Sequence, residues 1–161
     1  MITEPVPSTA RSGGGVGLRY ALIPVTGTGI AVMTAGRMLD AEGTGAEARI
    51  VQSGEPVPMG AQPVLLVEST VYGAVCVENV LRQWNVGYIP RPWLVLVADA
   101  PVGLAPAARY RFRALQSRVA GVAHVPYLPV LRSVEGPDAA MEHKTVRIAA
   151  AKLRRQLDEG K

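Results

Sequence analysis

Short apolar runs alternate along this chain with longer segments in which apolar residues recur every three or four positions. The short runs are rich in Val, Ile and Leu and have the length of buried strands, whereas the longer segments have the period of a helix. Strands are predicted over residues 20–25, 47–52, 63–68, 93–98 and 123–128. Helices are predicted over 30–41, 72–85, 105–120 and 139–158. This alternation is typical of βαβ units, whose strands form a parallel sheet.

Three of the predicted helices have an apolar stripe that requires a partner surface. The stripes are Gly73, Cys76, Val77, Val80 and Trp84 in the second helix, Ala108, Phe112, Leu115 and Val119 in the third, and Val146, Ala149, Ala150, Leu153 and Leu157 in the last. Pro24 and Pro126 interrupt two of the strands and are expected at sheet edges or strand ends. The pattern predicts an α/β fold, a three-layer α/β/α sandwich with a mostly parallel sheet of about five strands.

The chain has 161 residues, enough for one domain with a real core. Residues 1–17, rich in proline, serine and glycine, are expected to form a flexible arm, and 18–161 a single domain ending in a basic amphipathic helix. The N-terminus lacks the features of a secretory signal, and no stretch is apolar for long enough to span a membrane. Cys76 is the only cysteine, so no internal disulfide can form. These features predict a cytoplasmic protein.

The formal net charge is +4, which is compatible with a polyanionic partner. In the third helix, Arg109 and Arg113 fall on one side of the apolar stripe and Arg111 and Arg118 on the other. A solvated role is therefore expected for these four arginines.

The last helix differs, because its basic residues gather opposite its apolar stripe. They are Lys144, Lys152 and Arg155, with Arg147 and Arg154 extending the surface along one side. Two interpretations stay open, an ordinary surface helix and a contact with nucleic-acid backbone that does not depend on sequence. Membrane docking is disfavoured, because the stripe contains two alanines and no large aromatic residue.

The segment LIPVTGTGIAVMTAG, residues 22–36, lies where an α/β nucleotide-binding protein has its phosphate loop. When the pattern GxxxxGK[ST] is aligned on Gly29, Pro24 replaces the first glycine, Ile30 the lysine and Ala31 the hydroxyl residue. The degenerate phosphate-loop positions are thus Gly27, Thr28, Gly29 and Ile30. Either the glycines only permit a tight turn, or the helix N-terminus binds an anion weakly.

Two carboxylates follow predicted strands, at the edge where ligands bind in parallel sheets. Glu68 and Asp99 are therefore candidates for contact with a ligand or partner. Each also has an ordinary interpretation, since Glu68-Ser69-Thr70 can form a helix-capping turn and Asp99 precedes a proline turn. His124 and His143 stand without further ligands, so no metal site is predicted, and no catalytic residue is assigned.

The second half of the chain resembles the ParA/MinD group of P-loop ATPases. The resemblance rests on PVLLVESTVYGAVCVENVLRQW, on RPWLVLVADAP, and on Val125-Pro126-Tyr127-Leu128 followed by Gly136-Pro137. It implies a P-loop NTPase-like fold and covers roughly residues 20–158, more clearly after residue 63. The family's lysine-bearing loop is degenerate here, and the span between residues 36 and 63 is too short for the usual switch region.

Two functions are compared on this basis. The first is a structural or adaptor protein, a non-hydrolysing relative of the partitioning ATPases that needs no cofactor. Such a protein would self-associate or bind a protein partner, and could also contact DNA without regard to sequence. The alternative is an ATPase that uses ATP and magnesium with an atypical loop or with a lysine from a partner. The chain's lysines, Lys144, Lys152 and Lys161, are all far from the loop in sequence, which favours the first.

Overall fold

The structure is a computed structural model, which describes residues 17–52 and 54–160; the predicted arm, except Gly17, lies outside these residues. Its strands are β1 (Tyr20–Pro24), β2 (Ala48–Ile50), β3 (Gln62–Glu68), β4 (Trp93–Val97) and β5 (Gly121–Val125). They form a five-stranded sheet in the order β2-β1-β3-β4-β5, and every pair of neighbours is parallel. The predicted parallel sheet is confirmed.

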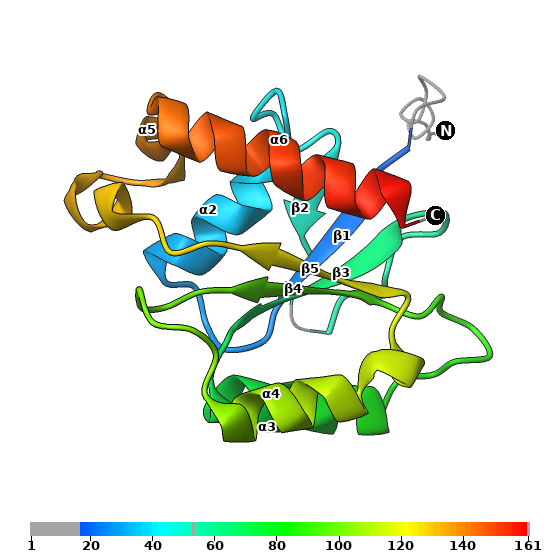
Figure 1. The fold of residues 1–161 in the computed structure, drawn as a ribbon. Coiled ribbons are helices and arrows are strands. Elements are labelled where there is room, and N and C mark those ends of the chain that lie inside the picture. The colour runs from blue at the N-terminus through cyan, green and yellow to red at the C-terminus, as the bar shows by residue number, and fades with distance from the viewer. Residues whose placement is uncertain (1–16, 53, 161) are drawn as a thin grey trace, which may run out of the picture.

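Helices cover both faces of this sheet (Figure 1). One face carries α2 (Ile30–Met38) and α6 (Lys144–Glu159), and the other carries α3 (Val71–Arg82) and α4 (Pro106–Ala114). Three short elements complete the fold: η1 (Gln116–Arg118), η2 (Pro129–Ser133) and α5 (Pro137–Ala140). The result is the predicted three-layer sandwich. Its strand order is one of the doubly wound orders, in which ligands bind at the carboxyl ends of the strands.

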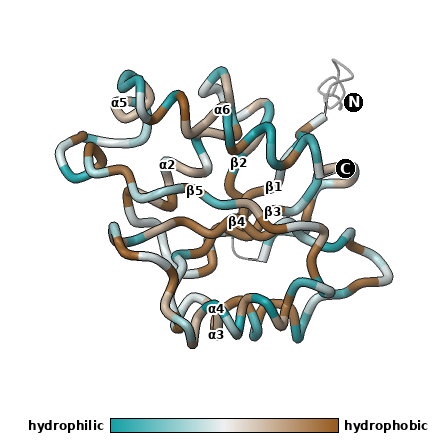
Figure 2. The backbone as a smooth tube through the Cα atoms, in the orientation of Figure 1, coloured by the Kyte–Doolittle hydropathy of each residue, from teal (hydrophilic) through white to brown (hydrophobic). Residues whose placement is uncertain are grey.

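The two central strands, β3 and β4, form the most buried part of the core. Residues 63–67 of β3 and all of β4 are buried, because both of their faces lie under helices. Leu65 and Leu94 face α3 and α4, whereas Leu66 and Val95 face α2 and α6. Hydropathy along the backbone shows the same arrangement, with the apolar colour concentrated in the sheet (Figure 2). Continuous apolar runs therefore mark strands that are covered on both sides.

Several predicted boundaries are wrong by a few residues. The first helix ends at Met38, the third gives way to the separate turn η1 after Ala114, and the last is divided into α5 and α6. The strand predicted over 123–128 begins at Gly121 instead and ends before Pro126, since proline offers no N–H to a ladder. Pro24 is the last residue of β1, which lies inside the sheet, so it marks a strand end and not an edge.

The stripe predicted for the second helix is correct only in part. Gly73 and Val77 are buried in α3, but Cys76, Val80 and Trp84 are half-buried, and Ala74 and Leu81 are buried in their place. The described part of the crossover from β2 to β3, residues 51–52 and 54–61, forms no helix. The stripes predicted for the third and last helices are buried throughout.

Candidate functional site

The turn between β1 and α2 is the segment that the sequence analysis compared with a phosphate loop. Gly27 has φ +116°, a value that favours glycine, whereas Gly29 has φ −64° and an added Cβ would meet nothing within 4 Å. Only Gly27 is therefore required by the turn. Gly29 is the N-cap of α2 and provides no side chain, and the first hydrogen bond of the helix runs from the Met33 N–H to the Gly29 carbonyl (2.9 Å).

This helix start opens onto a pocket of about 340 Å³ at the carboxyl edge of the sheet. Gly29, Ile30 and Ala31 line one side, and Ile30 is about 36% exposed. Two predicted site residues, Glu68 at the end of β3 and Asp99 just after β4, line another side. The topology thus brings together residues from three separate parts of the chain, as expected for the carboxyl ends of parallel strands.

The segment after β5 supplies the remaining wall of this carboxyl-edge pocket, and sequence reasoning did not identify it as part of the site. It contributes Tyr127, which is half-buried, and Arg132 from η2, which is exposed. Arg132 is the only cationic side chain among the described lining residues. The Val125–Leu128 motif indicated that this segment follows the last strand, but nothing in the local pattern indicated that Arg132 lines the same pocket as the helix start.

Hydrogen bonds fix the loops that frame the carboxyl-edge pocket. The Thr26 hydroxyl accepts a hydrogen bond from the Glu68 N–H (3.4 Å), and the Ser69 N–H donates to the Val97 carbonyl (3.0 Å). Thr70 is the N-cap of α3, and its hydroxyl accepts from the Gly73 N–H at 2.9 Å. The helix-start interpretation of Ser69 and Thr70 is thereby confirmed, and the Glu68 carboxylate takes no part in this cap.

The charges of the carboxyl-edge pocket favour a partner other than a polyphosphate. Among the described lining residues are two carboxylates, Glu68 and Asp99, and one guanidinium, Arg132, so the negative side chains outnumber the positive one. The partial positive charge at the start of α2 favours a single anion but amounts to only about half an elementary charge. Ile30 and Ala31 contribute neither a cation nor a magnesium ligand. In the described part of the chain, no three His, Cys, Asp or Glu residues gather into a metal-binding cluster.

The predicted basic residues of the last helix divide into two groups. Arg154 donates to the Met38 carbonyl at the end of α2 (2.6 Å), and Arg147 donates to the Met141 (3.2 Å) and Glu142 (2.6 Å) carbonyls after α5. These two guanidinium groups therefore hold helix ends, where a positive charge is stabilising. The other three candidates, Lys144, Lys152 and Arg155, are exposed on α6.

Comparison with models of known families, with curated proteins and with solved structures finds no match for this chain. The resemblance to the ParA/MinD group therefore depends on the residues quoted for it. None of the described helices has the length and the apolar character that crossing a membrane requires.

Proposed function

We propose that this protein is a non-hydrolysing relative of the ParA/MinD ATPases that acts as a structural or adaptor protein, through self-association or a protein partner. The observation that carries the proposal is the composition of the carboxyl-edge pocket. Ile30 and Ala31 stand at the helix start, and the carboxylates of Glu68 and Asp99 line the same pocket. Hydrolysis of ATP needs a cation on the transferring phosphate and a hydroxyl on magnesium, and this pocket provides neither at those positions.

No lysine from elsewhere in the described part of the chain replaces the lysine that the phosphate-loop pattern requires. Lys144 and Lys152 belong to α6, and neither lines the carboxyl-edge pocket. The alternative function, binding and slow hydrolysis of ATP, is favoured by one feature, the presence of Arg132 in the pocket. Arginine can hold a phosphate through its planar fork.

A thermal-shift titration with magnesium and ATP separates the two functions. Stabilisation follows RT ln(1 + [L]/Kd), so 1 mM ATP at a Kd of about 10 μM would add about 2.7 kcal/mol and raise Tm by roughly 5–10 °C. We expect no magnesium-dependent shift. A shift of several degrees that disappears in Arg132→Ala would establish the alternative.

Two further measurements complete the test. The double variant Ile30→Lys, Ala31→Thr should still fail to respond to ATP, because Pro24 remains at the first glycine position and the switch region is short. Light scattering of the purified chain should give a mass that does not change on addition of magnesium and ATP. An ATP-dependent change in mass would contradict a nucleotide-independent adaptor.

A further inference from the structure

A second pocket lies between α4 and strand β5, apart from the carboxyl-edge pocket. It has a volume of about 290 Å³, and the two pockets share no lining residue. Leu96 and Phe112 form the buried part of its wall, and Leu104 and Val122 are half-buried there. Apolar side chains from β4, α4, β5 and the loop before α4 thus meet in this α4–β5 pocket.

The polar side chains of the α4–β5 pocket can all donate hydrogen bonds, and none of them is a carboxylate. They are Arg109, Arg113, Gln116 and His124. By contrast, at least one Asp or Glu lines each of four other pockets of the described chain. The polar side of the α4–β5 pocket is therefore suited to a ligand group that accepts hydrogen bonds and carries negative charge.

Two guanidinium groups of this pocket are available to a ligand. Arg109 and Arg113 are four positions apart on α4, so their side chains leave the helix on the same face. Arg109 Nη2 donates to the Leu104 carbonyl (3.1 Å), which ties this guanidinium to the loop before α4. Among the described residues neither arginine takes part in an ion pair, whereas Arg111, between them, pairs with Glu78 of α3 (2.9 Å).

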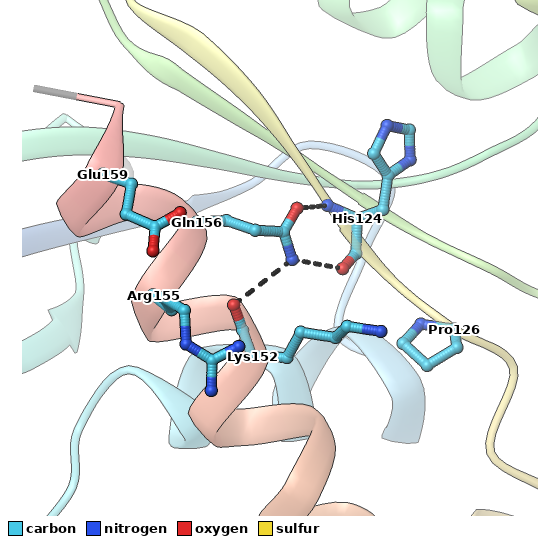
Figure 3. Close-up of a pocket in the computed structure, with 6 residues that line it drawn as sticks. All are labelled: His124, Pro126, Lys152, Arg155, Gln156 and Glu159. Atoms are coloured by element: carbon cyan, nitrogen blue, oxygen red, sulfur yellow. Dashed lines mark hydrogen bonds between the residues drawn. The ribbon is translucent and has the colours of Figure 1, made fainter.

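His124 adds a third donor from the edge strand. The side-chain amide of Gln156 accepts from the His124 N–H (3.0 Å) and donates to the His124 carbonyl (3.1 Å). Figure 3 shows this amide facing the backbone of His124, while the imidazole points away from α6. The hydrogen bonds to α6 thus hold the strand in place, and the imidazole ring is left to the side of β5 on which α4 lies.

We infer that the α4–β5 pocket binds a small monocarboxylate with a compact apolar body, such as a single aromatic ring. The carboxylate accepts hydrogen bonds from Arg109 and Arg113, and the ring packs against Phe112 and Val122. The planar guanidinium fork matches the two oxygens of a carboxylate, and such charge-assisted hydrogen bonds are the strong ones. The inference goes beyond the proposed function and does not depend on it, because the two pockets share no lining residue.

The size and the composition of the α4–β5 pocket limit this ligand. Pockets for small molecules have volumes of roughly 300–1,000 Å³ and combine mainly apolar walls with a few placed polar groups, so a pocket of about 290 Å³ admits only a small body. A ligand with charge alone would leave the apolar wall in contact with water. A ligand with an apolar body alone would gain nothing from the two guanidinium groups. The pocket therefore requires both parts in one molecule.

The test is a ¹H–¹⁵N NMR titration of the full chain with 3-phenylpropanoate, whose small size limits the expected Kd to about 1 mM. Amide shifts should concentrate at residues 104, 109, 113, 122 and 124. Two analogues separate the parts of the ligand: 3-phenylpropanamide keeps the ring without the charge, and acetate keeps the charge without the ring. Each should bind about tenfold more weakly or worse.

Variants of the arginines test the site itself. Arg113→Gln should weaken binding of 3-phenylpropanoate about fivefold or more, and Arg109→Lys, which keeps the charge and loses the planar fork, should also weaken it. Arg155→Gln is the matched control, because Arg155 is exposed on the α6 side of the same strand and does not line the α4–β5 pocket. It should bind as the unchanged chain does, and the spectrum of each variant shows whether its fold is retained.

Three results would overturn the inference. The first is no saturable shift at residues of the α4–β5 pocket with ligand at about 10 mM, ten times the expected Kd. The second is equal binding of 3-phenylpropanamide, which would leave the guanidinium groups without a role. The third is a loss in Arg155→Gln as large as that in Arg113→Gln, which would indicate attraction to the positive charge of the whole surface instead of binding in this pocket.

Discussion

Replacing Gly121 with alanine should destabilise the fold by crowding Trp93. The two residues are register partners in neighbouring strands β4 and β5. A Cβ on Gly121 would lie 2.4 Å from Cη2, 2.6 Å from Cζ3 and 2.7 Å from Cζ2 of the Trp93 ring, which is 5% exposed. Ordinary carbon contacts are about 3.5–4.0 Å, so the ring would have to move by about 1 Å.

The ring has little freedom to make that movement. Gly160, just after α6, approaches it as closely, with a Cβ there lying 2.4 Å from Cη2. Overpacking a core position costs about 1–3 kcal/mol, and a confined ring places Gly121→Ala near the upper end, at about 2–3 kcal/mol. For a domain of this size that corresponds to a fall in Tm of roughly 4–12 °C.

Urea unfolding followed by far-ultraviolet circular dichroism measures the loss. Gly103→Ala is the matched control, because an added Cβ meets nothing within 4 Å there, and it should leave the free energy of unfolding nearly unchanged. A double-mutant cycle with Trp93→Leu should show that Gly121→Ala costs much less once the ring is gone. Equal stabilities for Gly121→Ala and Gly103→Ala, or strictly additive effects in the cycle, would refute the reasoning.

Two further substitutions test how the loops are held. Asp40→Ala removes a buried carboxylate that accepts hydrogen bonds from the N–H groups of residues 45, 47 and 48 (2.7, 3.3 and 3.4 Å), and urea unfolding should show a loss of about 2–3 kcal/mol. Asp40→Asn should cost clearly less, and equal losses for the two variants would contradict the role of Asp40 as an acceptor. Gly73→Ala places a Cβ 2.2 Å from the Glu68 carbonyl oxygen, a backbone atom that cannot rotate away, and should lower the free energy of unfolding by about 3 kcal/mol. A melting temperature equal to that of Gly103→Ala would contradict this close approach.

The sequence predicts the fold well where burial is continuous. Residues 63–67 form an unbroken apolar run because helices cover both faces of β3, and the last helix shows its whole stripe because that stripe is buried against β5 and α2. Prediction is poorer where only part of a helix face is covered. Cys76 has the right spacing for a core position of α3, but it is only half-buried, and Ala74 and Leu81 are buried instead.

The candidate sites depend on contacts that local spacing does not contain. Glu68 and Asp99 could be placed in one pocket because topology fixes where parallel strands end, but Arg132 could not. The guanidinium of Arg154 looks free on a helical wheel and instead reaches a carbonyl 116 positions earlier in the chain. Likewise the spacing of the arginines in α4 does not indicate that Arg109 and Arg113 line one pocket with His124 of β5.

The short strand β2, at one edge of the sheet, has a consequence for the order in which the strands separate. β2 has three residues and pairs on one side only, whereas β1 pairs with β3 over five positions. Local opening needs least free energy where few apolar contacts and few ladder bonds are broken. Amide hydrogens of residues 48–50 should therefore exchange with solvent first and those of β3 and β4 last. The Val51 N–H, just after β2, donates to the Leu22 carbonyl of β1 (2.9 Å), so its exchange rate would report the opening of the β2 edge while the rest of the sheet stays closed.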